Sequence, residues 1–592
     1  MAYFAVYAPP EANGQALAQA QAQINASCSW RLAGRTASLR LWTSSDNEVV
    51  RPLGAEGFVI GEIYDASDGR PWVASPRPQR ATSSDLIASL CAHAFGRYVA
   101  ILGTPAPCAF RDPSGGRDCL VWQNGPLTFV CDDLEQAPSA LRPPRLALDW
   151  NVIARLAAAA SLATAELALE GAYDVMPGTS RSMAAPALSH THWTPAQFLR
   201  RKPAASNDEL AEALAERVDI AVKALLSAHE RLMVEVSGGL DSAILAGAIA
   251  RLGIQERVAG WLNYFTSRPE GDERAYARSV TDRIGATLTC AHLPVRALTE
   301  ADFKPLAKAV RPAFNALVPE RDEDAARRML EMGATGLVSG QGGDAVFYQM
   351  PSALIWSDEI RSHGLSALTS PLGPAMAQRL RRSLWSVLCE ALGEDRPKQR
   401  SFSITAVPRE VARRGHPWTP ADAKLSPAKR LQIIALANAH VATGKCRIAE
   451  SGSLLYPLTA QPVAEFCLGV PAATLTAGGR ERGLARHAFA DRVPAMVLRR
   501  RKKGELTAFH AQTVAASLDF LRPYLLDGTL AKAGVLDRRH LEVALNPEQL
   551  FWRGEGSELL VACALEAWVR HWQCYAPDSV RAGRQLWGER AR

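Results

Sequence analysis

Closely spaced cysteines and long uncharged apolar runs are both missing from the sequence. The eleven cysteines are scattered and odd in number, and no two of them form a Cys-x-x-Cys pair. Zinc ribbons, thioredoxin-like motifs and a disulfide framework are therefore disfavoured, and a reducing cytoplasm fits best. The most apolar stretch, residues 152–171, contains Arg155, Glu166 and Glu170, which argues against a membrane span. No basic residue precedes Arg31, so the N-terminus does not resemble a signal peptide.

Net charge and lysine content are also low. The 67 basic and 60 acidic residues of the 592-residue chain leave a net charge of +7, which is slight for this length and does not require a nucleic-acid partner. Only eleven of the basic residues are lysines, none precedes Lys202, and the only adjacent pair is Lys502 and Lys503. A lysine in this arginine-rich background can mark a position where arginine will not serve. The composition, 48% hydrophobic and 21% charged, is that of a globular protein of about two to four domains.

The pattern of strands and helices changes near residue 206. Before it, short β-rich runs lie between Gly, Pro and Asp clusters, and we expect strands at 58–64, 97–102, 119–122 and 127–131. A helix is expected at 84–94. After it, strands and helices alternate, which indicates a parallel sheet with helices on both faces. We expect strands at 232–236, 258–264 and 336–338, and helices at 208–229, 243–252, 273–284 and 557–572. The segment 177–207 is rich in Pro, Ser, His and Thr and is typical of a connection, so we place the domains at 1–205 and 206–592.

A glycine-containing loop, Ser-Gly-Gly-Leu-Asp-Ser, stands directly between the expected strand at 232–236 and the helix that follows. Its glycines let the backbone approach an anion closely, and its hydroxyl and N–H groups lie at a helix N-terminus, where negative charge is stabilised. It lacks the Gly-Lys-Ser/Thr of a Walker loop, so a γ-phosphoryl-transferring ATPase is disfavoured. The arrangement resembles the PP-loop of ATP pyrophosphatases, which bind the departing pyrophosphate and form AMP. The ATP-binding candidates in this loop are Val236, Ser237, Gly238, Gly239, Leu240, Asp241 and Ser242.

A second loop, Ser-Gly-Gln-Gly-Gly-Asp, follows the expected strand at 336–338. Since ligands bind at the carboxyl ends of the strands in a doubly wound sheet, both loops are expected to face one crevice. Asp241 and Asp344 would then offer two hard oxygen ligands to a Mg²⁺ ion held between the phosphates of ATP. Leu262 lies near the end of the strand at 258–264, where we expect adenine to take backbone hydrogen bonds. The second loop adds further ATP-binding candidates, Ser339, Gly340, Gly342 and Gly343.

Four segments, in order, resemble the asparagine synthetase family: SGGLDS (237–242), DERAYARSVTDRIGATL (272–288), SGQGGD (339–344) and GGRERGLARHAFADRVPAMVLRRRKKGE (478–505). The N-terminal third is similar to the glutaminase domain of that family at GEIY (61–64), FGRYVAI (95–101) and RDPSGG (111–116). The resemblance implies an α/β protein in which a degenerate glutaminase-like (Ntn-hydrolase-like) α+β domain precedes a doubly wound synthetase domain. That second domain would be a PP-loop ATP pyrophosphatase (adenine nucleotide α-hydrolase-like) with a mostly helical C-terminal part. The resemblance is weakest between residues 350 and 445.

The N-terminal domain departs from the family at its nucleophile. Family glutaminases need a cysteine at the processed N-terminus, with its own α-amine as the base. Here the chain starts Met1-Ala2-Tyr3, and the first cysteine is Cys28. The resemblance therefore implies a retained domain without glutamine hydrolysis or an ammonia supply, whose role is structural or that of a docking surface.

A second departure lies in the small-substrate pocket. Asparagine synthetases carry a Glu-x-Arg-x-Pro-Phe-Leu-Asp run that shapes this pocket, whereas residues 453–460 here are SLLYPLTA, so three charged positions are neutral. A buried free aspartate needs partners for its α-amine and α-carboxylate, and this pocket has lost them. Gln341 stands where asparagine synthetases have Glu and β-lactam synthetases have Tyr. We expect Gln341, Tyr348 and Tyr456 to line the substrate pocket.

An adenylating site without small-substrate recognition resembles the lasso peptide cyclases, which close a macrolactam in a ribosomal peptide. The resemblance implies that an Asp or Glu side chain of the core peptide becomes an acyl-adenylate and that the peptide's own N-terminal amine then attacks it, so that AMP and pyrophosphate are released. ATP and Mg²⁺ are the implied cofactors. A ribosomal precursor peptide, a leader peptidase and a leader-recognition protein are the expected partners, in the cytoplasm, without nucleic acid or membrane.

Two alternatives stay open. A β-lactam synthetase-like or ammonia-dependent amide ligase that acts on a small acid belongs to the same catalytic class. A PP-loop enzyme that modifies tRNA is more distant, because the chain has no cysteine pair for sulfur transfer and no basic stripe interleaved with aromatic residues. The arginine-containing insert at 350–445 could hold a folded peptide or be a solvated charged face.

The catalytic candidate is Lys502. In the family pattern Arg-Pro-Lys-Lys-Gly the first lysine is the catalytic one, and residues 500–504, RRKKG, align it with Lys502. A compact ammonium on a flexible stem can follow charge from the α-phosphate during adenylation to the oxyanion during amide formation. The scarcity of lysine supports this assignment, since the only adjacent lysine pair of the chain lies at this position.

Overall fold

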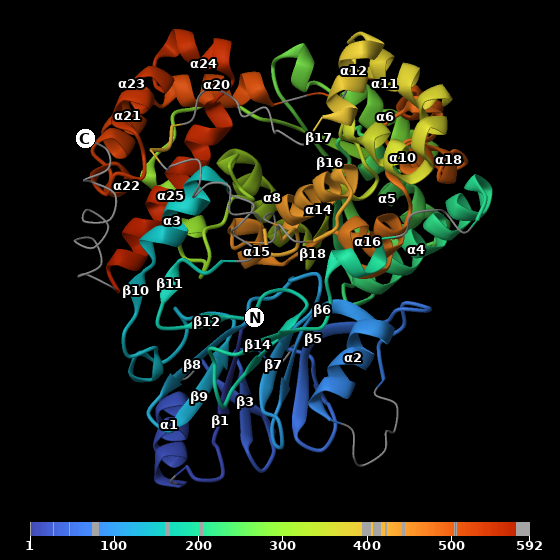
Figure 1. The fold of residues 1–592 in the computed structure, drawn as a ribbon. Helices are drawn as coiled ribbons and strands as arrows, with labels where there is room; N and C mark the ends of the chain where they lie inside the picture. The colour runs from blue at the N-terminus through green and yellow to red at the C-terminus, as the bar shows by residue number, and fades with distance from the viewer. Residues whose placement is uncertain are drawn as a thin grey trace.

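The protein has an N-terminal part built on two antiparallel sheets and a larger part built on one parallel sheet and many helices (Figure 1). The structure is a computed structural model. It describes residues 2–12, 14–27, 29–45, 48–73, 82–159, 166–199, 205–393, 404–406, 416–420, 423–440, 444–501, 504 and 506–575.

Two six-stranded antiparallel sheets form the N-terminal part, at the bottom of Figure 1. The first has the order β12-β8-β9-β1-β3-β2 and the second the order β14-β13-β7-β6-β5-β4. The strands of the first sheet are β1 (Tyr3–Tyr7), β2 (Arg31–Arg35), β3 (Leu39–Thr43), β8 (Leu120–Asn124), β9 (Leu127–Cys131) and β12 (Tyr173–Asp174). Those of the second are β4 (Val50–Pro52), β5 (Gly57–Asp65), β6 (Ala94–Leu102), β7 (Cys108–Arg111), β13 (Thr179–Ser182) and β14 (Ser189–Thr191).

The alternation of side chains along each strand produces four layers. In β1, Tyr3 and Ala5 point into a core shared with Val99 of the other sheet, while Phe4 packs on the outer face with Ile24 of helix α1 (Gly14–Ala26). Helix α2 (Ser83–His93) covers the outer face of the second sheet in the same way. Because successive side chains of a strand point to opposite faces, both faces of each sheet are buried. The finer glutaminase-like assignment stays a prediction.

The five-stranded sheet of the larger part is parallel throughout and has the order β17-β16-β15-β18-β19. The three strands expected from the sequence are confirmed as β15 (Leu232–Glu235), β16 (Val258–Phe265) and β18 (Gly336–Val338). The sequence reasoning missed two, β17 (Leu288–His292) and β19 (Ser453–Leu455). The chain runs from β15 to β16 on one side and later returns to β18 on the other side. The connections that leave β15 and β18 therefore run to opposite sides of the sheet, and the point between these two strands is a topological switch point, where ligands bind in sheets of this kind.

Helices cover both faces of this sheet. Val234 of β15 packs with α4 (Asn207–Ser227) and α5 (Leu240–Arg251), and Met233, its neighbour, packs with α7 (Glu300–Ala307) and α8 (Pro319–Met332) on the other face. Helix α6 (Arg274–Arg283) also matches the expected helix at 273–284. The expected alternation of strands and helices is thus confirmed.

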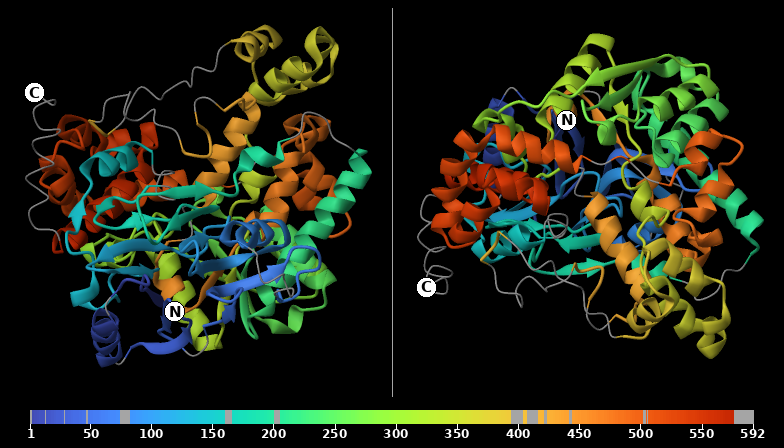
Figure 2. Two further views of the ribbon diagram at one scale, coloured as in Figure 1. Left: turned by 60° about the horizontal axis from the view of Figure 1, so that its bottom comes forward. Right: turned by 90° about the horizontal axis from the view of Figure 1, so that it is seen from above.

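The rest of the larger part is helical. Helices α10 (Leu354–His363), α11 (Leu372–Leu380) and α12 (Leu384–Leu392) form a lobe that projects from the body (Figure 2). The C-terminal helix α25 (Gly556–Gln573) carries Trp568 and Trp572, whose indole N–H groups both donate to the Ala309 carbonyl, at 2.8 and 3.0 Å. Both rings are buried, as expected for a stripe of core residues. Among the described residues, no helix combines the length and the apolar character needed to cross a membrane.

Ion pairs join the two parts. Arg311, which follows α7, forms ion pairs with Asp118, in the loop before β8, and with Asp174 of β12. Arg97 of β6 donates to the Leu454 carbonyl of β19 at 3.1 Å and is itself held by a carboxylate of β5. The outer edge of the parallel sheet is therefore in direct contact with the N-terminal part.

Candidate functional site

The loops that follow β15 and β18 meet at the switch point of the parallel sheet. We call residues 237–242 the first glycine loop and residues 339–344 the second. A Cβ atom on Gly340 would lie 2.8 Å from the Ser242 amide nitrogen, and one on Gly343 would lie 2.7 Å from the Asp241 carboxyl carbon. Real Cβ atoms do not approach other atoms this closely, so only glycine allows the two loops to pack together. The two glycine loops, which the sequence predicts to face one crevice, therefore contact each other and form a single site.

Hydroxyl groups fix the shape of the first glycine loop. The Ser242 hydroxyl accepts a hydrogen bond from the Ser237 amide at 3.2 Å and donates to the Gly239 carbonyl at 3.2 Å. The Ser237 hydroxyl accepts from the Gly239 amide at 3.3 Å. Gly239 is the N-cap of α5, a helix of 12 residues, so the free N–H groups of the first turn point out of this loop. A loop of this form is a preformed cradle for an anion such as phosphate.

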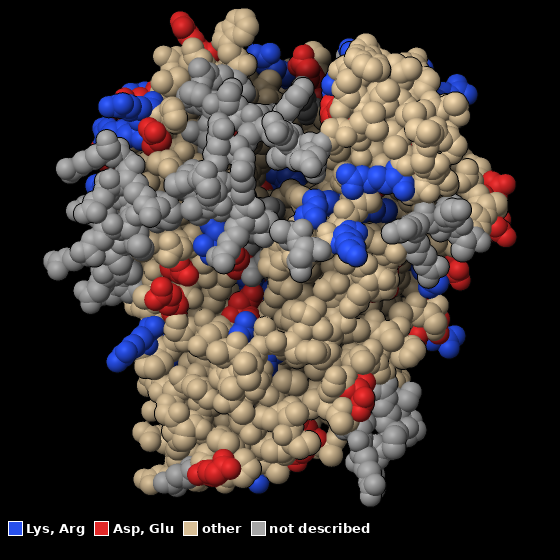
Figure 3. All heavy atoms as spheres, in the orientation of Figure 1, with Lys and Arg blue, Asp and Glu red and all other residues tan. Residues whose placement is uncertain are grey.

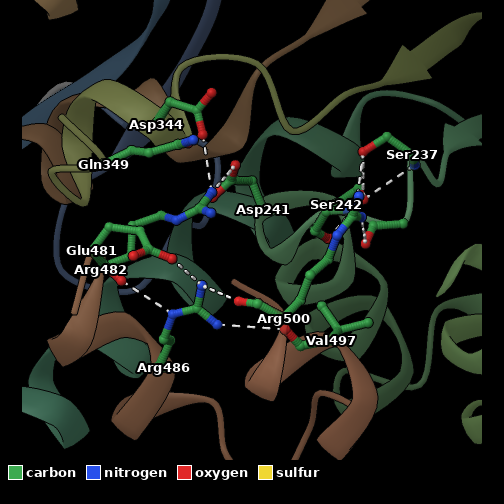
Figure 4. Close-up of polar contacts among 12 residues, drawn as sticks. Ser237, Asp241, Ser242, Asp344, Gln349, Glu481, Arg482, Arg486, Val497 and Arg500 are labelled. Carbon is green, nitrogen blue, oxygen red and sulfur yellow. Dashed lines mark hydrogen bonds and ion pairs between the residues drawn. The ribbon is translucent and has the colours of Figure 1, made fainter. Parts of the chain in front are cut away.

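A single arginine holds the two carboxylates of the site. Nη1 of Arg482 lies 2.9 Å from an Asp241 oxygen and 2.9 Å from an Asp344 oxygen (Figure 4). Because one cation touches both groups, the two carboxylates are close enough to share a divalent cation, and hard oxygen ligands suit Mg²⁺. No cluster of three or more His, Cys, Asp or Glu side chains suited to a metal occurs in the described part of the chain. A Mg²⁺ ion here would thus take its other ligands from phosphate and water.

A cavity of about 260 Å³ opens beside the first glycine loop, and its lining is strongly basic. Five of the lining side chains are arginines, and one is the carboxylate of Glu481. The arginines are Arg379, Arg482, Arg486, Arg500 and Arg501. Burial lowers the pKa of the Arg379 guanidinium, and the neighbouring Arg482 adds to the effect. Such a concentration of cations at a helix N-terminus is suited to a polyphosphate.

A larger hollow, of about 650 Å³, lies between α4 and α18 (Gly483–Ala488) and lacks these features. Its charged groups are mainly acidic, and several are already paired: Asp219 with Arg492 at 2.6 Å, and Asp208 with His487 at 2.7 Å. Neither glycine loop contributes to its lining. The smaller basic cavity is therefore the candidate site for a nucleotide.

The segment that precedes the C-terminal helices is attached to the first glycine loop. Arg500 donates to the Gly238 carbonyl at 3.2 Å, pairs with Glu273 and stacks 4.1 Å from the centre of the Tyr276 ring. The Gly504 amide donates to the same Glu273 carboxylate. Arg500 and Gly504 flank the catalytic candidate Lys502, which lies outside the described residues, so its role stays a prediction.

Comparison with known families matches this part of the chain. The family model for asparagine synthase covers residues 213–570. The chain belongs to the asparagine synthase family. A search of curated proteins finds no match.

Membership gives the site its general chemistry. Enzymes of this family are ATP-dependent, AMP-forming amide ligases, and Mg²⁺ is usual for them. The matched region includes the parallel sheet, both glycine loops and every residue of the basic cavity, whereas the two antiparallel sheets lie outside it.

The other ATP-binding candidates have structural partners. The Val236 amide donates to the Leu262 carbonyl at 2.8 Å, and the Val236 carbonyl accepts from the Asn263 side chain at 2.7 Å. Both Val236 and Leu262 are buried. The end of β16 is therefore tied to the start of the first glycine loop, and at Leu262, where we expect adenine to take backbone hydrogen bonds, the carbonyl already accepts one from Val236.

The three candidates for the substrate pocket lie in different surroundings. Gln341 is exposed, and Tyr456 is half-buried directly after β19. Tyr348 has a positive φ of 66° and no exposed surface, and its hydroxyl donates to the Ala428 carbonyl at 3.2 Å. The structure places Tyr348 in the core, so it offers no surface to a substrate in this conformation.

Several charged groups of the site were missed by the sequence reasoning. Arg482 and Arg486 belong to the segment 478–505 that carried the family resemblance; Arg486 lies in α18, whereas Arg482 is the N-cap of that helix. Glu235, the last residue of β15, pairs with Arg321 of α8 through two hydrogen bonds of 2.9 and 2.6 Å. This pair is 86 residues apart in sequence, and no local motif marks it.

Proposed function

We propose that this enzyme is a lasso peptide cyclase. It would adenylate an Asp or Glu side chain of a ribosomal core peptide and join the carbonyl to the peptide's N-terminal amine as a macrolactam. The observation that carries the proposal is the uncharged segment 453–460, which begins with strand β19. Thr459 from this segment packs so closely on Gly342 of the second glycine loop that a Cβ there would lie 2.0 Å from the Thr459 methyl carbon. Leu455, at one of the positions charged in asparagine synthetases, accepts with its carbonyl from the Ser339 amide of the second glycine loop at 3.0 Å, so this position is neutral beside the adenylating loops, which supports a substrate other than free aspartate.

The surface near the site also supports a large substrate. The lobe of α10 to α12 exposes apolar side chains: Leu365 is 81% exposed, Trp385 74% and Leu392 61%. Figure 3 shows the lobe at the upper right, largely free of charged side chains, above a group of basic side chains. Exposed apolar surface of this kind is typical of sites that bind a peptide or protein. A small acid would leave it unused.

The chemistry assigns a task to each group of the site. The substrate carboxylate oxygen attacks the α-phosphorus of ATP, the bond between the α-phosphorus and the bridging oxygen breaks, and pyrophosphate leaves. The arginines of the cavity and the N-terminus of α5 would orient the phosphates and stabilise the leaving charge. Asp241 and Asp344 would hold Mg²⁺, which when bound neutralises phosphate oxygens.

The second half of the reaction needs only an amine. The N-terminal amine of the peptide attacks the acyl carbon, the bond from that carbon to the AMP oxygen breaks, and the nitrogen loses a proton. Lys502 would stabilise the oxyanion that forms in between. Since the nucleophile belongs to the substrate, no ammonia source is required.

The test uses the purified protein with ATP, Mg²⁺ and a leaderless precursor peptide. A short precursor gene beside the gene for this protein would supply the peptide sequence. We expect a product lighter than the peptide by one water, and one AMP and one pyrophosphate per product. Free aspartate should not stimulate exchange between ATP and pyrophosphate. Aspartate-stimulated exchange, with amide formation from ammonia and no cyclised peptide, would establish the small-acid amide ligase instead.

A further inference from the structure

The Arg482 side chain occupies the position between the two candidate metal ligands. We infer that Arg482 makes metal binding conditional on nucleotide binding: it keeps Asp241 and Asp344 closed to a free divalent cation and releases them when a polyphosphate enters the cavity. The inference rests on the proposed role of these two aspartates as Mg²⁺ ligands.

The Arg482 guanidinium lies where a metal ion bound by both aspartates would lie. The same nitrogen atom of Arg482, Nη1, is 2.9 Å from a carboxylate oxygen of Asp241 and 2.9 Å from one of Asp344 (Figure 4). The Arg482 side chain is only 5% exposed and that of Asp241 only 7%. A metal ion that binds these two oxygens at once has to take the place of this nitrogen.

The backbone at Arg482 is built for this contact. Arg482 has a φ of +55°, one of three positive values among the non-glycine residues that the structure describes, and it stands at the N-cap of α18. Its amide donates to the Tyr348 carbonyl at 3.3 Å. A left-handed conformation is unfavourable for arginine, so packing holds the residue here and directs its side chain at the two carboxylates.

The surrounding charge opposes a free metal ion and favours a metal bound together with nucleotide. Arg482 lines the basic cavity with four further arginines, and among the described residues of that lining Glu481 is the only carboxylate. A divalent cation that arrives alone meets these positive charges and also has to displace a guanidinium. A triphosphate reverses the sign of the local charge and gives the Arg482 guanidinium new acceptors in the same cavity.

Coupling of this kind works in both directions. If nucleotide raises the affinity for metal by some factor, metal raises the affinity for nucleotide by the same factor. Without the guanidinium, metal would no longer have to displace Arg482 from the two carboxylates. Nucleotide would then add much less to metal affinity.

The test measures Mn²⁺ binding by the electron paramagnetic resonance signal of free Mn²⁺, with and without an ATP analogue that has a methylene bridge between the α- and β-phosphates. Without nucleotide, Arg482→Met should bind Mn²⁺ at least about tenfold more tightly than the natural protein, within the usual range of coupling between sites. The analogue should increase Mn²⁺ affinity strongly in the natural protein and only weakly in Arg482→Met. Neither measurement depends on the peptide substrate.

Arg501→Met is the matched control, because Arg501 is an exposed arginine of the same cavity. Without nucleotide, it should change Mn²⁺ affinity by less than about threefold, since it removes a charge but leaves the bridge between Arg482 and the two carboxylates. Adding Asp241→Asn to Arg482→Met should abolish the new Mn²⁺ binding, which places the ion at this carboxylate. Arg482→Lys, which keeps one positive charge, should stay close to the natural protein.

Two results would overturn the inference. One is an Arg482→Met protein, folded by circular dichroism, with the Mn²⁺ affinity of the natural protein. The other is an equal effect from Arg501→Met, which would reduce the role of Arg482 to its charge. A different result would refute the proposed metal site itself: unchanged Mn²⁺ binding, in the presence of the analogue, by Asp241→Asn and Asp344→Asn.

Discussion

At the scale of single residues, the proposed reaction depends most on Lys502. We expect Lys502→Ala, and also Lys502→Arg, to lose cyclisation while ATP still binds, because a preorganised cation at a developing oxyanion contributes about 10²–10³ in rate. Single-turnover formation of cyclic peptide and AMP measures the loss, and binding of labelled ATP measures what is kept.

Lys503→Ala is the control for this experiment, since it removes the same charge one position away. It should be milder. An active Lys502→Ala enzyme beside an inactive Lys503→Ala enzyme would show that the alignment is wrong by one residue.

A second residue, Glu465, makes stability depend on pH. Burial raises the pKa of this carboxyl to about 7, against the lowering effect of the Trp193 indole and the Gln461 amide, which donate to it at 2.6 and 2.8 Å. Between its unfolded value, near 4.5, and 7, the folded state holds a proton that the unfolded state has lost. Stability from this group therefore falls as the pH rises through that window and stays low above it.

Glu465→Gln should remove this dependence, because an amide oxygen can accept the same hydrogen bonds without ionising. At pH 8 the variant should be more stable than the natural protein by up to about 3 kcal/mol, at 1.36 kcal/mol per pKa unit. At pH 4 the difference should vanish. Urea unfolding at both pH values measures it, with the exposed Glu212→Gln as a control for the change in charge. An equal stabilisation at both pH values would show that ionisation is not the cause.

At the scale of elements, α14 (Pro427–His440) supports the second glycine loop from behind. Gln432 donates to the Val346 carbonyl at the end of α9 (Gly343–Val346), at 2.8 Å. The Lys429 ammonium donates to Gln432 at 2.8 Å and to the carbonyls of Cys467, at 3.1 Å, and Val470. It thereby satisfies carbonyl groups at the C-terminus of α16 (Gln461–Gly469), which would otherwise be buried without donors.

Lys429 is 4% exposed, so a larger cation has no room. We expect Lys429→Arg to destabilise the protein by about 1–3 kcal/mol through overpacking. Lys429→Ala should cost about 2–4 kcal/mol through unsatisfied carbonyls and lost packing. Chemical unfolding provides the values, and the exposed Lys223→Arg on α4 should change stability by less than about 0.5 kcal/mol. If Lys429→Arg were as harmless as Lys223→Arg, the close fit around the ammonium would be refuted.

At the scale of the whole molecule, Arg311 is a main connection between the antiparallel sheets and the synthetase part. Its guanidinium is 7% exposed and contacts Asp118 and Asp174, and burial lowers its pKa to about 10. Asp174 is buried as well. Without Arg311 these two carboxylates share the single guanidinium of Arg111, which lies 3.1 Å from Asp118 and 3.8 Å from Asp174, and breaking a buried pair costs up to about 3–5 kcal/mol.

Arg311→Met should therefore lower the melting temperature and separate the unfolding of the two parts into two calorimetric transitions. Adding Asp174→Asn to Arg311→Met should recover part of the loss, because one carboxylate, Asp118, then faces the one remaining guanidinium, Arg111. A single transition at the natural temperature for Arg311→Met would show that this ion pair does not couple the two parts.

The local pattern was sufficient for most elements of the parallel sheet. The expected strands and helices agree with β15, β16, β18, α4, α5 and α6 to within about three residues at their ends. The helices among them are long, and the strands β15 and β18 are short but stand directly before the two glycine-containing motifs that marked them. Ser206 and Glu209 form a capping box at the start of α4. The strand β19 was missed because its three residues carry too little periodicity and, unlike the equally short β18, it is not followed by a glycine motif.

The sequence by itself determined that two glycine loops follow two strands of one parallel sheet, because strand alternation and glycine spacing are properties of neighbouring residues. Only the tertiary structure decided which cation lies between Asp241 and Asp344. Arg482 is 241 residues from the first of these carboxylates and 138 from the second. Its contact with both depends on a left-handed backbone at the start of α18 and on the close packing of two glycine loops, and neither leaves a periodic signal in the chain. The chemistry of the loops is thus encoded locally, whereas control of their charge arises from long-range packing.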